Sequence, residues 1–133
     1  DEDLPDLPIP WETYLNPEPE NAPENYTPET SISEWCIAGR YATVMPDGQM
    51  CPCSVIRTPI GDLRKQTAKE IWESSELVQY LRSLKVKDLD CYGCKYFPRC
   101  RPCIGIAYQE TGSFTARPKE YCRMTRRYLD KNG

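Results

Sequence analysis

"CYGCKYFPRCRPC", residues 91–103, places four cysteines within thirteen positions of a 133-residue chain that contains no histidine. Four further cysteines lie outside this stretch, at Cys36, Cys51, Cys53 and Cys122. Leu, Ile, Val and Phe make up only 23 of the 133 residues, below the roughly 20% that a chain needs to offset its conformational entropy by burying apolar surface. We therefore expect the cysteines to hold the fold together in place of part of a hydrophobic core.

The first 34 residues differ in composition from the rest of the chain. They hold ten Asp and Glu, no Lys or Arg, and seven of the thirteen prolines. Proline fixes φ and disfavours helix at the preceding residue, so we expect residues 1–34 to form an irregular acidic arm. A body at residues 35–130 and a short tail at 131–133 would follow. Four apolar side chains could anchor the arm on the more basic body: Trp11, Tyr14, Leu15 and Tyr26.

The body reads as a small α+β fold with a β-hairpin and several short helices. Residues 41–45 and 49–55 would form the hairpin around a Pro-Asp-Gly turn. We predict two helices within residues 67–84. A capping box should start the first, and Ser74 or Ser75 should cap the second. Two side chains are expected in the core: Ile71 and Trp72. A short helix should end at Gly112, and a final helix should begin near Pro118.

The sequence allows three roles for the cysteines: disulfide bonds, structural zinc sites and iron–sulfur clusters. Disulfides suit small secreted domains with an even cysteine count, but paired Cys-x2-Cys units are typical of metal ligation. Structural zinc also uses such units, although zinc ribbons usually separate two pairs by more than the five residues between Cys94 and Cys100. Iron–sulfur clusters accept thiolates from one short run plus a distant residue, and they need no histidine. We favour iron–sulfur clusters, which imply a reducing, cytoplasmic environment because unprotected thiols oxidise.

The order of seven cysteines and one glycine resembles the SPASM domain, the auxiliary-cluster domain of radical S-adenosylmethionine enzymes that modify peptides and proteins. The pattern is Cys36-x11-Gly48-x4-Cys53, then Cys91-x2-Cys94-x5-Cys100 with Cys103, and finally Cys122. The segment "IGDLRKQTAKEIWESSELVQYLRS" between its halves also resembles the family. The likeness covers residues 35–129. It departs from the commonest pattern in having two residues, not three, between Cys100 and Cys103.

The resemblance implies two [4Fe–4S] clusters with interleaved ligands. Cys36, Cys53 and Cys103 would bind the first cluster, and the second would be bound by Cys91, Cys94, Cys100 and Cys122. The first cluster also needs a fourth ligand. Cys51 is the only other cysteine, and the alternation of a strand would put it on the same face as Cys53. Cys51 as the ligand, and an iron site left open to substrate, solvent or another residue, are both possible at this stage.

The expected function is electron transfer and substrate positioning within a radical S-adenosylmethionine enzyme that modifies a peptide or protein. The Cys-x3-Cys-x2-Cys triad that initiates such radicals is absent from this sequence. We therefore expect S-adenosylmethionine to bind a catalytic barrel outside this chain, which could be a fragment because it begins with Asp.

The sequence indicates no other partner. No run of about 18 apolar residues or signal peptide is present, so we expect no membrane contact. Arg123, Arg126 and Arg127 could contact phosphate, but no nucleic-acid motif accompanies them, and a solvated basic face or a partner for the acidic arm fits better. The alternative function is a non-redox binding module held by two zinc sites.

Overall fold

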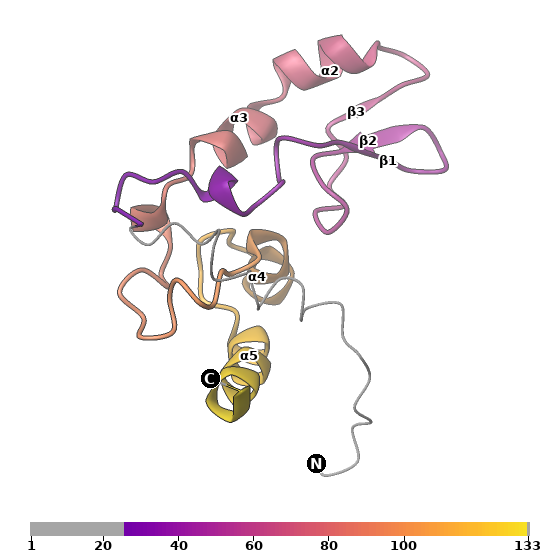
Figure 1. Ribbon diagram of the computed structural model, residues 1–133. Helices are drawn as coiled ribbons and strands as arrows, with labels where there is room; N and C mark the ends of the chain where they lie inside the picture. The colour runs from indigo at the N-terminus through magenta and orange to yellow at the C-terminus, as the bar shows by residue number, and fades with distance from the viewer. Residues whose placement is uncertain (1–25, 133) are drawn as a thin grey trace.

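The computed structural model describes residues 26–132 as a small α+β fold, as predicted, with a three-stranded sheet and four α-helices. The sheet and the helix next to it lie at one end, and the C-terminal helix lies at the other (Figure 1). The elements in chain order are η1 (Ile32–Glu34), β1 (Thr43–Val44), β2 (Gln49–Cys51), β3 (Gly61–Asp62), α2 (Ala68–Ser74), α3 (Glu76–Ser83), η2 (Val86–Asp88), α4 (Ile104–Thr111) and α5 (Lys119–Asn132). Most of the predicted arm, with Trp11, Tyr14 and Leu15, lies outside the described residues.

The sheet is antiparallel with the order β1-β2-β3. The predicted hairpin turn is confirmed, because Gly48 has a φ of 85° and its N–H donates to the carbonyl of Met45 at 2.9 Å. Met50, on the central strand, pairs with Val44 on one side and with Gly61 on the other. The third strand was not predicted, since a two-residue strand carries almost no local signal.

The return strand of the hairpin is shorter than predicted, and it leaves Cys53 in a loop. We expected a strand over residues 49–55, but β2 ends at Cys51. Pro52 has no N–H to donate to a ladder, and beyond it the chain turns around the thiol of Cys53. That sulfur accepts hydrogen bonds from the backbone N–H of Val55 at 3.3 Å and of Ile56 at 3.2 Å. The expected alternation between Cys51 and Cys53 therefore does not apply.

The two helices after the sheet begin as predicted. The Thr67 hydroxyl accepts from the N–H of Glu70 at 3.2 Å, and the Glu70 carboxylate accepts from the N–H of Thr67 at 3.3 Å, which completes the capping box. Ser75, rather than Ser74, caps α3. Ile71 is buried, as predicted, whereas Trp72 is only partly buried and so belongs to the edge of the core.

One hydrophobic core brings together segments that are far apart in the sequence. Its buried members come from η1, the Cys53 loop, α3 and α4, and they include a cysteine: Ile32, Ala38, Cys53, Ile56, Leu81, Leu84, Leu89 and Ile104. Cys36 and Cys91 pack against this core from its edge. Three of the predicted metal ligands are thus part of the core or in contact with it.

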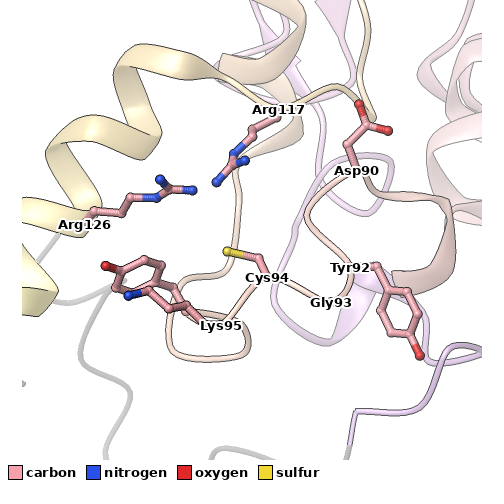
Figure 2. A pocket seen from close by; sticks show the side chains of 8 residues that line it. Asp90, Tyr92, Gly93, Cys94, Lys95, Arg117 and Arg126 are labelled. Carbon is pink, nitrogen blue, oxygen red and sulfur yellow. The ribbon is translucent and has the colours of Figure 1, made fainter.

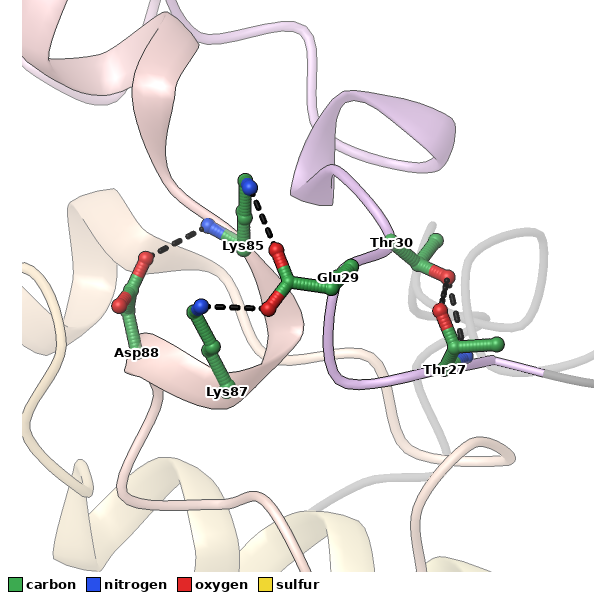
Figure 3. Close-up of polar contacts among 6 residues, drawn as sticks. All are labelled: Thr27, Glu29, Thr30, Lys85, Lys87 and Asp88. Atoms are coloured by element: carbon green, nitrogen blue, oxygen red, sulfur yellow. Dashed lines mark hydrogen bonds and ion pairs between the residues drawn. The ribbon is translucent and has the colours of Figure 1, made fainter.

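The last residues of the acidic arm are attached to the body. Tyr26 packs against Trp35 and Phe97, with ring centroids 5.5 Å and 5.4 Å apart. Glu29 lies between Lys85 and Lys87 and forms an ion pair with each (Figure 3). Hydrogen bonds from these two ammonium groups lower the pKa of Glu29 to about 2. The predicted anchoring of the arm is thus confirmed at Tyr26.

The two C-terminal helices have the predicted boundaries. Gly112, with a φ of 79°, ends α4 in the left-handed conformation that glycine adopts at little cost. Buried Pro118 stands directly before α5, and its carbonyl accepts from the N–H of Cys122 at 2.9 Å. Within residues 26–132, no helix combines the length and the apolar character needed to cross a bilayer.

Candidate metal centres

The structure brings seven of the eight cysteines into two groups, and members of both groups belong to the core or pack against it. Three of them, Cys36, Cys53 and Cys103, are electrostatic neighbours, although they come from three different parts of the chain. The other four are likewise neighbours of one another: Cys91, Cys94, Cys100 and Cys122. These are the two ligand sets that the family resemblance implies. All eight cysteines lie within the described residues, and all eight thiols are free of disulfide bonds.

Backbone amides surround the first group. Cys53 accepts from two amides in its loop, the N–H of Ala38 faces the thiol of Cys36, and Cys103 stands at the N-cap of α4. Cys103 makes no regular capping hydrogen bond, but the amides of Gly105 and Ile106 lie close enough to its thiol to favour the thiolate. Amide donors and the positive end of a helix both stabilise a negatively charged sulfur.

The second group is built from successive tight turns and the start of α5. The N–H of Cys94 donates to the carbonyl of Cys91 at 3.0 Å, and the N–H of Cys100 donates to the backbone carbonyl of Tyr96 at 2.8 Å. Gly93 has a φ of 83°, which allows the first of these turns. The Tyr96 hydroxyl donates to the Asp130 carboxylate at 2.9 Å and so ties the loop to α5, which carries Cys122.

Burial keeps several of these thiols protonated in the metal-free chain. It raises the pKa of Cys36 and of Cys91 to about 11 and that of Cys100 to about 12, and neighbouring thiols add to each shift. Burial also raises the pKa of Cys103. Because metals bind the thiolate, a cation must displace these protons, so metal binding is coupled to proton release.

Cys51 lies apart from the first group in its surroundings. It is fully buried on β2, opposite Thr43. Burial, followed by the charge of Asp47, raises the pKa of its thiol, and the charge of Arg57 lowers it. Cys53 is its one thiol neighbour among the groups that act on it. The strand therefore holds Cys51 in the ladder, whereas the thiols of Cys36 and Cys103 act on each other and on that of Cys53.

The donor set fits an iron–sulfur cluster better than a single ion. All the candidate ligands are soft thiolates, which suit zinc and iron–sulfur clusters. Among the described residues, no three His, Cys, Asp or Glu side chains are placed to hold one metal ion. A mononuclear zinc site would draw its sulfurs to about 2.3 Å from a common point, whereas a cubane spreads its irons over several ångströms. The looser grouping of the thiols is compatible with the larger centre.

A basic pocket that the sequence did not reveal opens beside the second group. It has a volume of about 480 Å³, and Cys94, Lys95, Tyr96, Arg117 and Arg126 are among the residues that line it (Figure 2). The guanidinium of Arg117 contacts the thiols of Cys122 and Cys94, and this contact raises the pKa of Arg117. Nothing in the local sequence "ARPKEYC" distinguishes Arg117 from a surface arginine. Its place becomes visible only when the loop and the start of α5 meet.

Of the three arginines on α5 that the sequence singled out, the structure brings only Arg126 into this pocket. Arg123 pairs with Glu120, three residues earlier, at 3.0 Å, and Arg127 is exposed.

Three curated relatives match the chain, all described as AdoMet-dependent heme synthase. The protein from Methanosarcina barkeri is 29% identical over 93 residues, and the one from Nitratidesulfovibrio vulgaris is 26% identical over 95 residues. These matches cover 69% and 71% of this chain but only 26% of each relative. The chain therefore spans about a quarter of the length of these relatives. No solved structure matches it.

The model of the SPASM family, described as an iron–sulfur cluster-binding domain, matches residues 36–104. This range is about half of the chain and includes seven cysteines. Cys122 lies beyond the match, and it is the fold that brings it to Cys91 and Cys100. With its cysteines grouped as described above, the chain belongs to the SPASM family of iron–sulfur cluster-binding domains.

Proposed function

We propose that this chain is the auxiliary part of a radical S-adenosylmethionine enzyme and that its two cysteine groups each hold a [4Fe–4S] cluster. The observation that carries the proposal is that Cys36, Cys53 and Cys103, from three separate segments, are electrostatic neighbours. The family match and the names of the relatives support it. The two zinc sites of the alternative reading have no family match in their support.

The protein's own residues would bind, shield and tune the clusters. The core residues beside Cys53 exclude water from the first group, and the amides of Val55 and Ile56 stabilise its charge. The loop and α5 leave the second group next to an open pocket. Bound clusters would supply one-electron chemistry, with potentials set by hydrogen bonds to sulfur, nearby charge and exposure to solvent. The proposed role is to take an electron from a substrate and to help position that substrate.

Two different observations each suggest a reaction for the longer enzyme to which this chain would belong, called the parent reaction below. The family resemblance of the sequence implies modification of a peptide or protein, with the radical formed on a catalytic barrel in the same or a separate chain. The relatives are described as heme synthases, and this favours an anionic tetrapyrrole as the substrate class of the parent enzyme. We propose the heme-type reaction as the second candidate, to be tested against peptides in the same assay. A reducing cytoplasm remains the proposed location for either.

Anaerobic reconstitution of the purified chain tests the proposal. We expect about eight iron and about eight sulfide per chain for two [4Fe–4S] clusters, and broad visible absorption that dithionite bleaches. A colourless protein with stoichiometric zinc and no sulfide would instead establish the binding-module alternative. The parent reaction is tested separately on the longer enzyme that contains the barrel, with heme precursors and peptides offered in parallel.

A further inference from the structure

The surroundings of the two cysteine groups differ in charge. The pocket beside the second group is lined by eight residues, three of them cationic and one acidic: Asp90, Tyr92, Gly93, Cys94, Lys95, Tyr96, Arg117 and Arg126. Figure 2 shows the guanidinium groups of Arg117 and Arg126 directed at the space beside the Cys94 sulfur, while the carboxylate of Asp90 points away from it. Positive charge is thus concentrated on the open side of the second group.

The two arginines are held in place by different parts of the fold. Arg117 directly precedes buried Pro118, which fixes its backbone at the start of α5. Arg126 lies four residues after Cys122 and hence on the same face of that helix. Its guanidinium carbon is 5.4 Å from the centre of the Tyr96 ring, and Tyr96 is itself anchored by a hydrogen bond to Asp130. The cysteine loop and α5 therefore position both cations together.

Within the described part of the chain, no cation is among the groups that shift the pKa of Cys36 or Cys103 in the first group. Cys36 and Cys103 are influenced by burial, by backbone amides and by neighbouring thiols. Arg57 acts on Cys51 and donates to the carbonyl of Ser54. The charge of the first group is therefore balanced mainly by backbone amide dipoles beside an apolar core. The charge of the second group is balanced by cationic side chains at its open side.

We propose that Arg117 and Arg126 raise the reduction potential of the cluster held by Cys91, Cys94, Cys100 and Cys122 above that of the other cluster. This inference rests on the proposed function, because it presumes that both groups hold clusters. A cluster with four thiolate ligands is anionic, and reduction adds another negative charge. A cation directed at it favours the reduced form and therefore raises the potential. The second site then retains an electron more readily than the first.

The experiment separates the two clusters by mutation and then removes the cations. The full chain carrying Cys103→Ser would keep the second cluster and lose the first. In that background, Arg117→Gln and Arg126→Gln are compared with Arg117→Lys, which keeps the charge. Arg127→Gln serves as the matched control, since it removes the same charge from an exposed position on the same helix. Each protein is reconstituted anaerobically and titrated with dithionite, with electron paramagnetic resonance reporting the reduced cluster.

At a fixed solution potential, we expect each glutamine variant to lower the ratio of reduced to oxidised second cluster by about threefold to tenfold. Solvent and salt partly screen charges near the surface, and this screening sets the range. The lysine variant should retain most of the original ratio, and the Arg127→Gln variant all of it. In the Cys122→Ser background, which would keep only the first cluster, the same arginine changes should leave the ratio unaltered. If Arg117→Gln prevents loading, Arg126→Gln still provides the measurement.

The inference is overturned if the second cluster titrates unchanged in both glutamine variants, or if Arg127→Gln shifts it equally. That outcome would leave the proposed function intact, because each background would still have loaded the one cluster that it retains. A wild-type chain that takes up no cluster would overturn the proposed function and this inference with it.

Discussion

The thiol of Cys103 lies within electrostatic reach of the thiol of Cys53, although strand β3, helices α2 and α3, and the cysteine loop separate them in the chain. The first sits at the N-cap of α4 and the second in the loop after β2. A metal centre that bound both would tie the two ends of the body together. A chain so poor in aliphatic residues would gain from such a link, because a centre that binds only the folded chain adds its binding free energy to the free energy of folding.

The ligand sets can be separated by two single substitutions. Cys122→Ser should reduce the iron content of the reconstituted chain by half, from about eight atoms to about four, because it affects only the second group. Cys103→Ser should have a similar effect on iron, but it should leave the cluster beside Arg117. Iron and sulfide assays with electron paramagnetic resonance check both variants. Retention of both clusters in either variant would contradict the grouping of the thiols.

Cys51 provides a further test of the first site. Its thiol is fully buried on β2 and has Cys53 as its thiol neighbour, so we expect it not to be a ligand. Cys51→Ala should therefore leave iron and sulfide unchanged, with a loss of stability of about 1 kcal/mol from the small cavity. The parallel Cys53→Ala variant should lose the first cluster. An equal loss of iron in both variants would instead make Cys51 the fourth ligand.

The sequence predicted the elements that have local signals. Thr67 and Glu70 marked the start of α2, Gly48 marked the hairpin turn and Gly112 marked the end of α4; all three are confirmed. Strand β3 and the shortened β2 could not be predicted in this way. The pairing of Met50 with Gly61 and the turn around the Cys53 sulfur depend on contacts that no propensity describes.

The candidate site was likewise predicted only where the sequence carries a local signal. The number and spacing of the cysteines indicated a metal centre, but spacing alone does not say which distant thiols meet. Their assignment to two sets came from the family resemblance, and the fold places the same residues together. Arg117 was missed because its role depends on the approach of the loop to α5. Arginines are common on helix surfaces, so neither its type nor its position marked it.

Close packing at Gly105 supports the first site and is open to a direct test. A Cβ at this position would lie 2.7 Å from Cγ1 of Val55 and 3.1 Å from Cγ1 of Ile56. These residues donate their amides to the Cys53 sulfur. Gly105→Ala should therefore push α4 from the Cys53 loop, lower the free energy of unfolding by about 1–3 kcal/mol, and weaken the first cluster selectively.

A double-mutant cycle separates this clash from a general effect of alanine. Val55→Ala removes the methyl groups that the new Cβ would meet, so the double variant should be more stable than the sum of the two single changes predicts. Thermal unfolding of the loaded proteins, followed by circular dichroism, provides the free energies. Strict additivity would show that the approach of α4 to the loop does not limit the packing.

The raised thiol pKa values predict how the stability of the metal-free chain depends on pH. Burial raises the pKa of Cys91 to about 11 and that of Cys100 to about 12, from a value of 9.0 in the unfolded chain. The unfolded state therefore loses protons first, and the stabilisation that is fully present below pH 9 is lost as the pH rises toward 11 to 12. We expect the melting temperature of the reduced, metal-free chain to fall steadily across this interval.

The loaded chain should behave differently, because its ligands are already thiolates and have no proton to lose. Its melting temperature should not fall between about pH 8.5 and 10.5, because unfolding frees thiolates that take up protons below a pKa of 9.0; ordinary lysine and tyrosine residues also begin to titrate in this range. The Cys91→Ala/Cys100→Ala variant, without metal, corrects for that background and should show a weaker fall than the metal-free wild type. Identical pH profiles for the metal-free wild type and this variant would mean that the two thiols are not buried in the folded chain.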